Sequence, residues 1–136
     1  MSVFVDTSAL FAILDADDSN HARADEAWSR LLTEAEELVS TNYVLVETFA
    51  LVQRRLGVEA VKTLHEDIVP VLTIEWIDRS QHTSAISQLI ATAHRQISLV
   101  DWISFGTMQR LRIKTAFAFD QDFQARGFQT VPSETR

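Results

Sequence analysis

Short apolar segments alternate with amphipathic segments along almost the whole chain, and no other feature constrains the fold as strongly. The short segments are rich in β-branched and aromatic residues, as strands are, whereas the amphipathic segments repeat their apolar residues at helical spacing. Strands that alternate with helices imply an open, mainly parallel sheet covered by helices on both faces. The expected fold class is therefore α/β, with a sheet of four to five strands between two helical layers.

The same patterns predict where each element begins and ends. The expected strands cover residues 2–5, 38–40, 71–74, 116–119 and 128–131. The expected helices cover residues 7–14, 20–32, 43–56, 58–65, 80–94, and a segment from 99 or 100 to about 111. Gly57 is typical of the residue that follows a helix end, and Pro70 marks the break before the third strand.

Composition limits the kind of protein that this sequence can form. A chain of 136 residues with 46% hydrophobic content, 3 Gly and 2 Pro predicts a single domain over residues 1–136. Because there is no cysteine, disulfides and thiolate metal sites are excluded, and any metal must be held by oxygen or imidazole. The apolar start carries Asp6 and Asp15 and lacks the basic residues of a signal peptide, and no segment is long enough to span a membrane. A cytoplasmic protein is expected.

The charge of the chain does not decide whether it binds nucleic acid. A formal net charge of −7 argues against it, because phosphate binding normally rests on Lys and Arg. Bound divalent cations would reverse that argument, since their own charge offsets converging carboxylates. Arg110, Arg112 and Lys114 form a short basic cluster, which either contacts phosphates or is a solvated helix end that complements the helix dipole.

Several acidic residues follow expected strands or begin expected helices. Asp6 and Asp120 come directly after strands, where open α/β sheets bind their ligands. Each acid also has a purely structural interpretation. Asp6 would cap the helix after it, Asp101 would complete a capping box with Ser98, and Asp120 and Asp122 would be turn and first-turn residues.

Glu47 is harder to explain structurally, because it lies inside an apolar helical segment with no positive partner on its own helix face. An ionised carboxylate that is removed from water without a partner costs several kcal/mol. The sequence therefore predicts that Glu47 meets a metal ion, an arginine from another helix, or a partly hydrated position at the sheet edge.

Taken together, these acids indicate an oxygen-ligand metal site. Mg²⁺ and Mn²⁺ prefer carboxylate ligands, and such ions orient a water and stabilise the charge that builds on a phosphodiester during attack. The chain has no Gly-rich phosphate loop, no strong zinc spacing and no adjacent Ser-His or Cys-His arrangement. Hydrolysis by an activated water therefore fits the sequence better than a covalent mechanism.

Four segments resemble the motifs of PIN-domain nucleases, in the order in which that family has them. They are VFVDTSAL at 3–10, VLVET at 44–48, SLVDWISF at 98–105, and AFDQDF at 118–123 followed by Gly127 and Phe128. Within the family, the chain is similar to the VapC-type toxins of toxin–antitoxin pairs. The resemblance implies a PIN-like three-layer α/β/α fold and a Mg²⁺- or Mn²⁺-dependent endoribonuclease.

The resemblance also implies residue roles and partners. The catalytic metal ligands would be Asp6, Glu47, Asp101 and Asp120, with Asp122 as a fifth metal ligand and Thr7 close to the site as a hydroxyl ligand or a helix cap. The expected partners are an RNA substrate, a cognate VapB-like antitoxin and a second copy in a homodimer. Trp102 departs from the family pattern, in which a smaller residue is expected, so it either alters substrate access or packs outward.

Two other functions are compatible with the sequence. The first is a catalytically weak module that keeps the fold and binds RNA or a partner. The second, a phosphomonoester hydrolase, is disfavoured because Asp6-Thr7-Ser8 lacks the nearby second Asp and the lysine of a phosphoaspartyl mechanism.

His21 would either assist proton transfer or lie on the surface.

Overall fold

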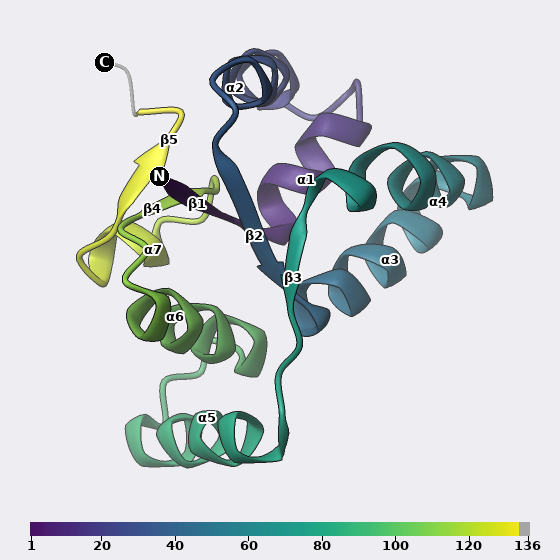
Figure 1. Ribbon diagram of the computed structural model, residues 1–136. Helices are drawn as coiled ribbons and strands as arrows, with labels where there is room; N and C mark the ends of the chain where they lie inside the picture. Colours follow the sequence, from purple (N-terminus) through teal and green to yellow (C-terminus); the bar gives the residue numbers. More distant parts are fainter. Residues whose placement is uncertain (134–136) are drawn as a thin grey trace.

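The expected strands form one parallel sheet in the computed structural model, which describes residues 1–133. The strand order is β3-β2-β1-β4-β5, and every neighbouring pair is parallel (Figure 1). The strands are β1 Ser2–Val5, β2 Glu37–Thr41, β3 Thr73–Glu75, β4 Thr115–Phe117 and β5 Gln129–Val131. The predicted α/β class is confirmed. The single domain over residues 1–136 stays a prediction, and its last three residues lie outside the described part.

Helices connect the strands, and all but the last of those described were predicted from the sequence pattern. They are α1 Thr7–Leu14, α2 His21–Thr33, α3 Asn42–Leu56, α4 Val58–Thr63, α5 Arg79–Thr92, α6 Leu99–Leu111 and α7 Asp122–Ala125. Gly57 ends α3 with a φ of 96°, a conformation that glycine adopts without steric cost. Among residues 1–133, no helix combines the length and the apolar character that crossing a bilayer requires.

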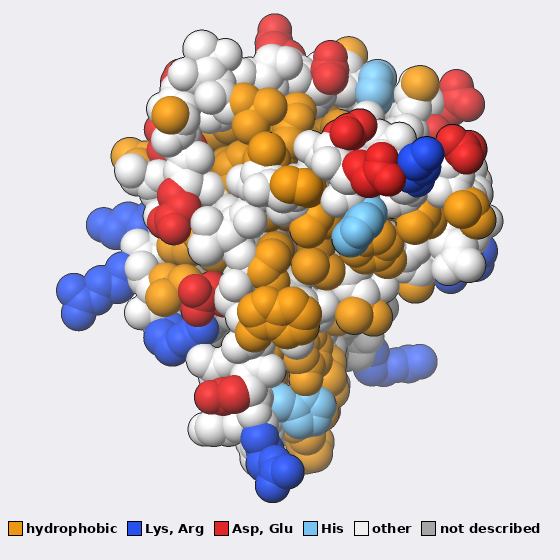
Figure 2. Space-filling view, turned by 45° about the vertical axis from the view of Figure 1, so that its right-hand side comes forward, with side chains coloured by type: hydrophobic (Ala, Val, Ile, Leu, Met, Phe, Trp, Pro, Cys, Tyr) orange, Lys and Arg blue, Asp and Glu red, His pale blue; other side chains and the backbone are white. Residues whose placement is uncertain are grey.

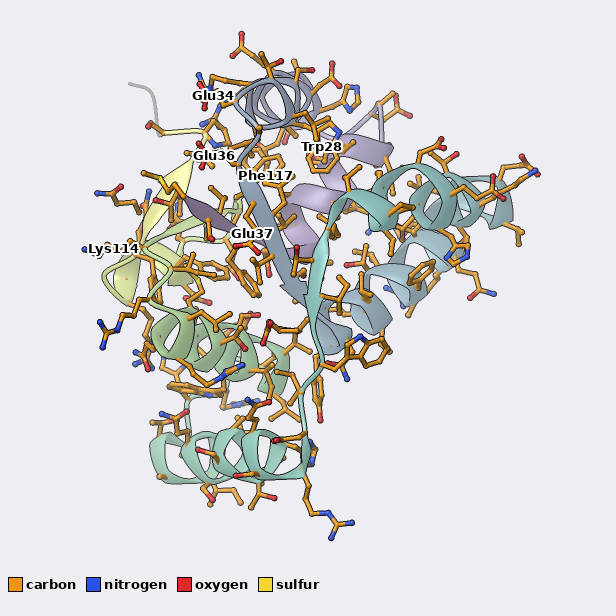
Figure 3. The ribbon with its side chains drawn as sticks, viewed as in Figure 1. Trp28, Glu34, Glu36, Glu37, Lys114 and Phe117 are labelled. Carbon is orange, nitrogen blue, oxygen red and sulfur yellow. The ribbon has the colours of Figure 1, made fainter. Side chains whose placement is uncertain are left out.

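The sheet is packed between two helical layers, because successive side chains of each strand point to opposite faces. Phe4 of β1 faces α7, where its ring centroid lies 6.4 Å from that of Phe123. Phe117 of β4 faces α2 and stacks on Trp28 at 6.4 Å (Figure 3). Phe4, Phe117 and Phe123 are fully buried, and each such side chain stabilises the fold by about 1.5–3 kcal/mol.

Some boundaries differ from those predicted. A π-helical turn, Leu64–Ile68, and a 3₁₀ turn, Val69–Val71, follow α4, so β3 begins at Thr73 rather than at 71. The strand expected over 116–119 ends at Phe117, because the amide of Phe119 donates to Ser8 Oγ instead of to a neighbouring strand. The four-residue helix α7 was not predicted as an element, since it is too short to show a helical period.

The strand order has a switch point at β1. The chain adds β2 and β3 on one side of β1 and then β4 and β5 on the other, so the direction of sheet growth reverses at β1. Crevices in open α/β sheets form at the carboxyl ends of the strands at such a switch point. Asp6 lies there, with its amide donating to the Phe117 carbonyl at 3.1 Å, and Asp120 lies on the segment after β4.

Candidate functional site

A cavity of about 490 Å³ lies at the carboxyl ends of the central strands and brings four of the predicted acids together. Asp6 reaches it from the end of β1, Glu47 from α3, Asp101 from the first turn of α6, and Asp120 from the segment between β4 and α7. The full lining is Asp6, Thr7, Ser8, Glu47, Ala50, Leu51, Arg54, Ser98, Asp101 and Asp120.

Asp122 joins the site beside this cavity. One carboxylate oxygen from each of Asp101, Asp120 and Asp122 lies within 4.8 Å of the other two. Mg²⁺ binds oxygen at about 2.0–2.1 Å, so two ligands on opposite sides of one ion are about 4 Å apart. Small rotations of the three side chains would bring their oxygens to that separation. The donor set is therefore chemically and geometrically suited to a hard divalent cation.

Asp6 is both a helix cap and a cavity-lining acid. Its Oδ2 accepts from the Ser8 amide at 3.1 Å and from Ser8 Oγ at 2.7 Å, which caps α1. The side chain is buried, and burial raises the pKa of Asp6 to about 6, with the charges of Asp101 and Asp120 adding to the rise and the bonds from Ser8 opposing it. The structural interpretation is thus correct, yet it leaves Oδ1 without a hydrogen bond from residues 1–133.

Asp101 is held in the same way. Its Oδ2 accepts from the Ser98 amide at 2.9 Å, and its own amide donates to Ser98 Oγ at 3.1 Å, so the predicted capping box is present. Burial raises the pKa of Asp101, the bonds to Ser98 oppose that rise, and the charge of Asp120 adds to it. The capping box holds the carboxylate in one orientation, with Oδ1 accepting no hydrogen bond from the described residues.

The last two acids repel each other. Asp120 Oδ1 accepts from the Asp122 amide at 2.9 Å. Burial is the main cause that raises the pKa of Asp122. The charge of Asp120, a hydrogen bond with the Asp120 carboxyl and the charge of Asp101 raise this pKa further, whereas the charge of His94 lowers it. A divalent cation would relieve this crowding of like charges.

Glu47 is not buried, so the desolvation cost inferred from its apolar neighbours does not arise, and its hydrated position is one of the alternatives that the sequence left open. Its side chain is exposed, as are those of Val46 and Ala50, whereas Val44, Thr48 and Val52 of the same helix are buried. The apolar residues around Glu47 therefore do not all belong to the core, because α3 packs on the sheet through one face only. Glu47 nevertheless lines the cavity, so its place in the site rests on geometry rather than on a desolvation penalty.

Two hydroxyl side chains complete the wall of the cavity. Thr7 Oγ1 lies 2.9 Å from Thr48 Oγ1 and bonds with it, so its polar atom is already engaged. Ser8 was not predicted as a functional residue. Its hydroxyl donates to Asp6 and accepts from the Phe119 amide at 2.9 Å, which ties the end of β1 to the segment that carries Asp120. The sequence signals for Ser8 were its place two residues after Asp6 and inside the first of the four family motifs.

The basic cluster lies away from the acids. Arg110 pairs with Glu75 at 3.5 Å near the end of α6, and this helix of 13 residues carries Asp101 in its first turn. At about 1.5 Å per residue, the two ends of α6 are about 20 Å apart. The acidic cavity is lined by none of the three residues of the basic cluster, Arg110, Arg112 and Lys114.

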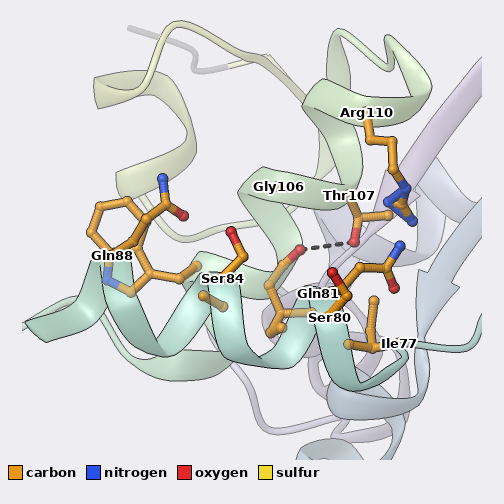
Figure 4. A pocket seen from close by; sticks show the side chains of 11 residues that line it. Ile77, Ser80, Gln81, Ser84, Gln88, Gly106, Thr107 and Arg110 are labelled. Carbon is orange, nitrogen blue, oxygen red and sulfur yellow. Dashed lines mark hydrogen bonds between the residues drawn. The ribbon is translucent and has the colours of Figure 1, made fainter.

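Trp102 packs inward beside a different cavity. It is 4% exposed, and the Arg126 guanidinium lies 4.2 Å from the centre of its ring. It lines a cavity of about 260 Å³ between α5 and α6, together with residues such as Gln81 and Thr107 (Figure 4). Trp102 does not line the acidic cavity, and neither does His21, whose Nδ1 lies 2.7 Å from the Ala12 carbonyl oxygen.

Comparison with known proteins gives the same family as the motifs. The PIN-domain model matches residues 3–129. The 23S rRNA-specific endonuclease VapC20 of Mycobacterium tuberculosis is 34% identical over 133 residues, which cover 97% of this chain and 99% of that protein.

Solved structures agree with this match. The crystal structure of Mycobacterium tuberculosis VapC20, a sarcin–ricin loop cleaving toxin, superposes with a TM-score of 0.82 at 32% identity, covering 93% of this chain and 95% of that one. FitAcB from Neisseria gonorrhoeae shares the fold, with a TM-score of 0.68 at 16% identity and 96% of both chains covered. The chain therefore belongs to the PIN-domain family and, within it, to the VapC-type endoribonuclease toxins.

Proposed function

We propose that this toxin hydrolyses RNA phosphodiester bonds with Mg²⁺ or Mn²⁺ held by Asp6, Glu47, Asp101 and Asp120, and with Asp122 as a fifth ligand. The observation that carries the proposal is the convergence of these carboxylates at the switch point of the sheet, three of them with oxygens within 4.8 Å of one another. These residues would hold a divalent cation, which would ease the deprotonation of a water and offset the negative charge that builds on the phosphodiester.

Hydrogen bonds at the starts of two helices orient the carboxylates that would hold the metal. The caps of α1 and α6 hold Asp6 and Asp101 by one oxygen each, so the second oxygen has a defined direction. Glu47 closes the cavity from the exposed face of α3. The hydroxyls of Thr7 and Ser8 are engaged with Thr48 and Asp6, which leaves water as the nucleophile that the site favours.

We infer that the substrate is a structured loop of ribosomal RNA. The inference rests on 34% identity over nearly the full length of a relative named as a 23S rRNA-specific endonuclease. Incubating purified protein with ribosomes and mapping the new RNA ends tests it. Cleavage confined to messenger or transfer RNA under the same conditions would contradict it.

We also propose two protein partners, a VapB-like antitoxin that covers the acidic cavity and a second copy of this chain. Apolar side chains that a monomer leaves in water include Val46, 70% exposed, Trp76, 73% exposed, and Ile90, 72% exposed. Hydrophobic side chains also run in a band across one face of the molecule (Figure 2). Sedimentation of the purified chain tests the dimer, and loss of cleavage on adding the product of a neighbouring small gene tests the antitoxin.

Metal removal should abolish the activity. With excess EDTA, cleavage of a panel of structured RNAs is expected to fall to the level without protein, because the carboxylates alone cannot offset the charge of the phosphodiester. Excess Mg²⁺ or Mn²⁺ should restore it, as measured by gel electrophoresis of end-labelled RNA. Cleavage that persists in EDTA would refute the metal mechanism. Folded protein that binds RNA without cleaving it in either ion would instead support the weakly catalytic binding module.

A further inference from the structure

We propose that Arg54 binds a backbone phosphate of the RNA a few nucleotides away from the phosphate that is cleaved, so that the substrate strand lies along α3. This inference rests on the proposed function, because it names a substrate contact in the same cavity. Arg54 is the one Lys or Arg among the described residues that line the acidic cavity. Nothing in the sequence motifs assigns it a role.

One face of α3 forms the wall along which the strand would lie. Glu47, Ala50, Leu51 and Arg54 all line the cavity, and their spacing of three, four and seven residues places them on the same side of the helix. Seven residues span about 10 Å of helix axis. A stacked strand of duplex DNA covers that distance with about three nucleotides, at about 3.4 Å for each, so a stacked RNA segment that spans it contains a few nucleotides. The small side chain of Ala50 leaves room above the helix between the acid and the arginine.

The guanidinium of Arg54 is available for a ligand. Within residues 1–133, no carboxylate lies within 4.0 Å of it, and it stacks on no ring. Its neighbour Arg55, by contrast, lies over the Phe11 ring at 5.4 Å and does not line the cavity. Arg110 is paired with Glu75.

The electrostatics of the cavity explain why an arginine is useful there. The four carboxylates of the cavity would repel the phosphates of an RNA strand. Bound divalent cations would offset the charge of these carboxylates only in the immediate vicinity of the ions. A strand that leaves the metal site along α3 next meets Arg54. A guanidinium donates two parallel hydrogen bonds to a phosphate, which positions the backbone without reading the base.

The test compares Arg54→Gln with the matched control Arg55→Gln, which removes the same charge from the adjacent position outside the cavity. The affinity for a fluorescein-labelled stem–loop RNA, measured by anisotropy in an Asp101→Asn background, is expected to fall about tenfold for Arg54→Gln and little for Arg55→Gln. The slope of log K against log salt should also become shallower by about 0.7–1 for Arg54→Gln. Arg54→Lys should restore that slope but only part of the affinity, because it keeps the charge and loses the two-pronged geometry.

Cleavage kinetics with Asp101 intact provide the second readout. Arg54→Gln is expected to raise KM with little change in kcat, since the contact is made equally before and during the reaction. Equal RNA affinity and equal salt slope for the two glutamine variants would overturn the inference and leave the metal nuclease standing. Because the anisotropy measurement does not depend on cleavage, a failure of the proposed nuclease mechanism would be seen separately, as wild-type protein that binds the RNA without cleaving it.

Discussion

Replacing Asp101 by asparagine is expected to lower metal-dependent RNA cleavage by at least about 10²–10³-fold while the protein stays folded. Asparagine keeps a side-chain oxygen that can accept from the Ser98 amide, so the capping box at the start of α6 survives. What the variant loses is the negative charge beside Asp120 and Asp122, on which cation binding depends. The measurement is the initial rate of cleavage of an end-labelled RNA at saturating Mg²⁺.

The matched control is Asp25→Asn, which removes one carboxylate from an exposed position on α2, outside the cavity. Its rate should equal that of the unmodified protein. If Asp101→Asn also cleaved at the unmodified rate, Asp101 would not belong to the catalytic metal site, and the capping box would be its whole function.

Replacing Asp6 by asparagine is expected to stabilise the metal-free protein at pH 7 by about 2–3 kcal/mol and to abolish its activity. Burial raises the pKa of Asp6 from 3.8 to about 6, so the ionised form is disfavoured in the folded state. Below pH 3.8 both states are protonated and the group costs nothing. As pH rises from 3.8 to about 6, the unfolded chain releases its proton first, and the free energy of unfolding falls.

Urea denaturation in EDTA at several pH values between about 3.5 and 7 measures this effect. The decline in stability over the window from 3.8 to about 6 should be smaller in Asp6→Asn than in the unmodified protein. Added Mg²⁺ should stabilise the unmodified protein more than the variant, because the ion compensates the buried charge. A variant less stable than the unmodified protein at pH 7 in EDTA would show that the charge of the α1 cap outweighs the cost of burial.

The order and type of most elements follow from local patterns in the sequence. The bounds of β1 and α1 agree with the prediction to the residue, because the β-branched run ends abruptly at Asp6, which caps the next helix. The start of α6 was also predictable, since Ser98 and Asp101 form a capping box. The predicted bounds were less accurate for strands whose ends depend on contacts distant in the sequence. β3 and β4 have only three residues each, and their ends depend on pairing with strands that are distant in the sequence.

The sequence by itself determined which chemistry is available, namely carboxylates at the ends of strands and starts of helices, and no thiols. Only the tertiary structure decided which of these groups meet. The strand order places Asp6 beside the segment that carries Asp120, while the packing of α3 through one face leaves Glu47 in solvent and Arg54 on the cavity wall. The physical reason is that residue spacing fixes periodicity along one element, whereas burial and proximity depend on how separate elements pack against each other.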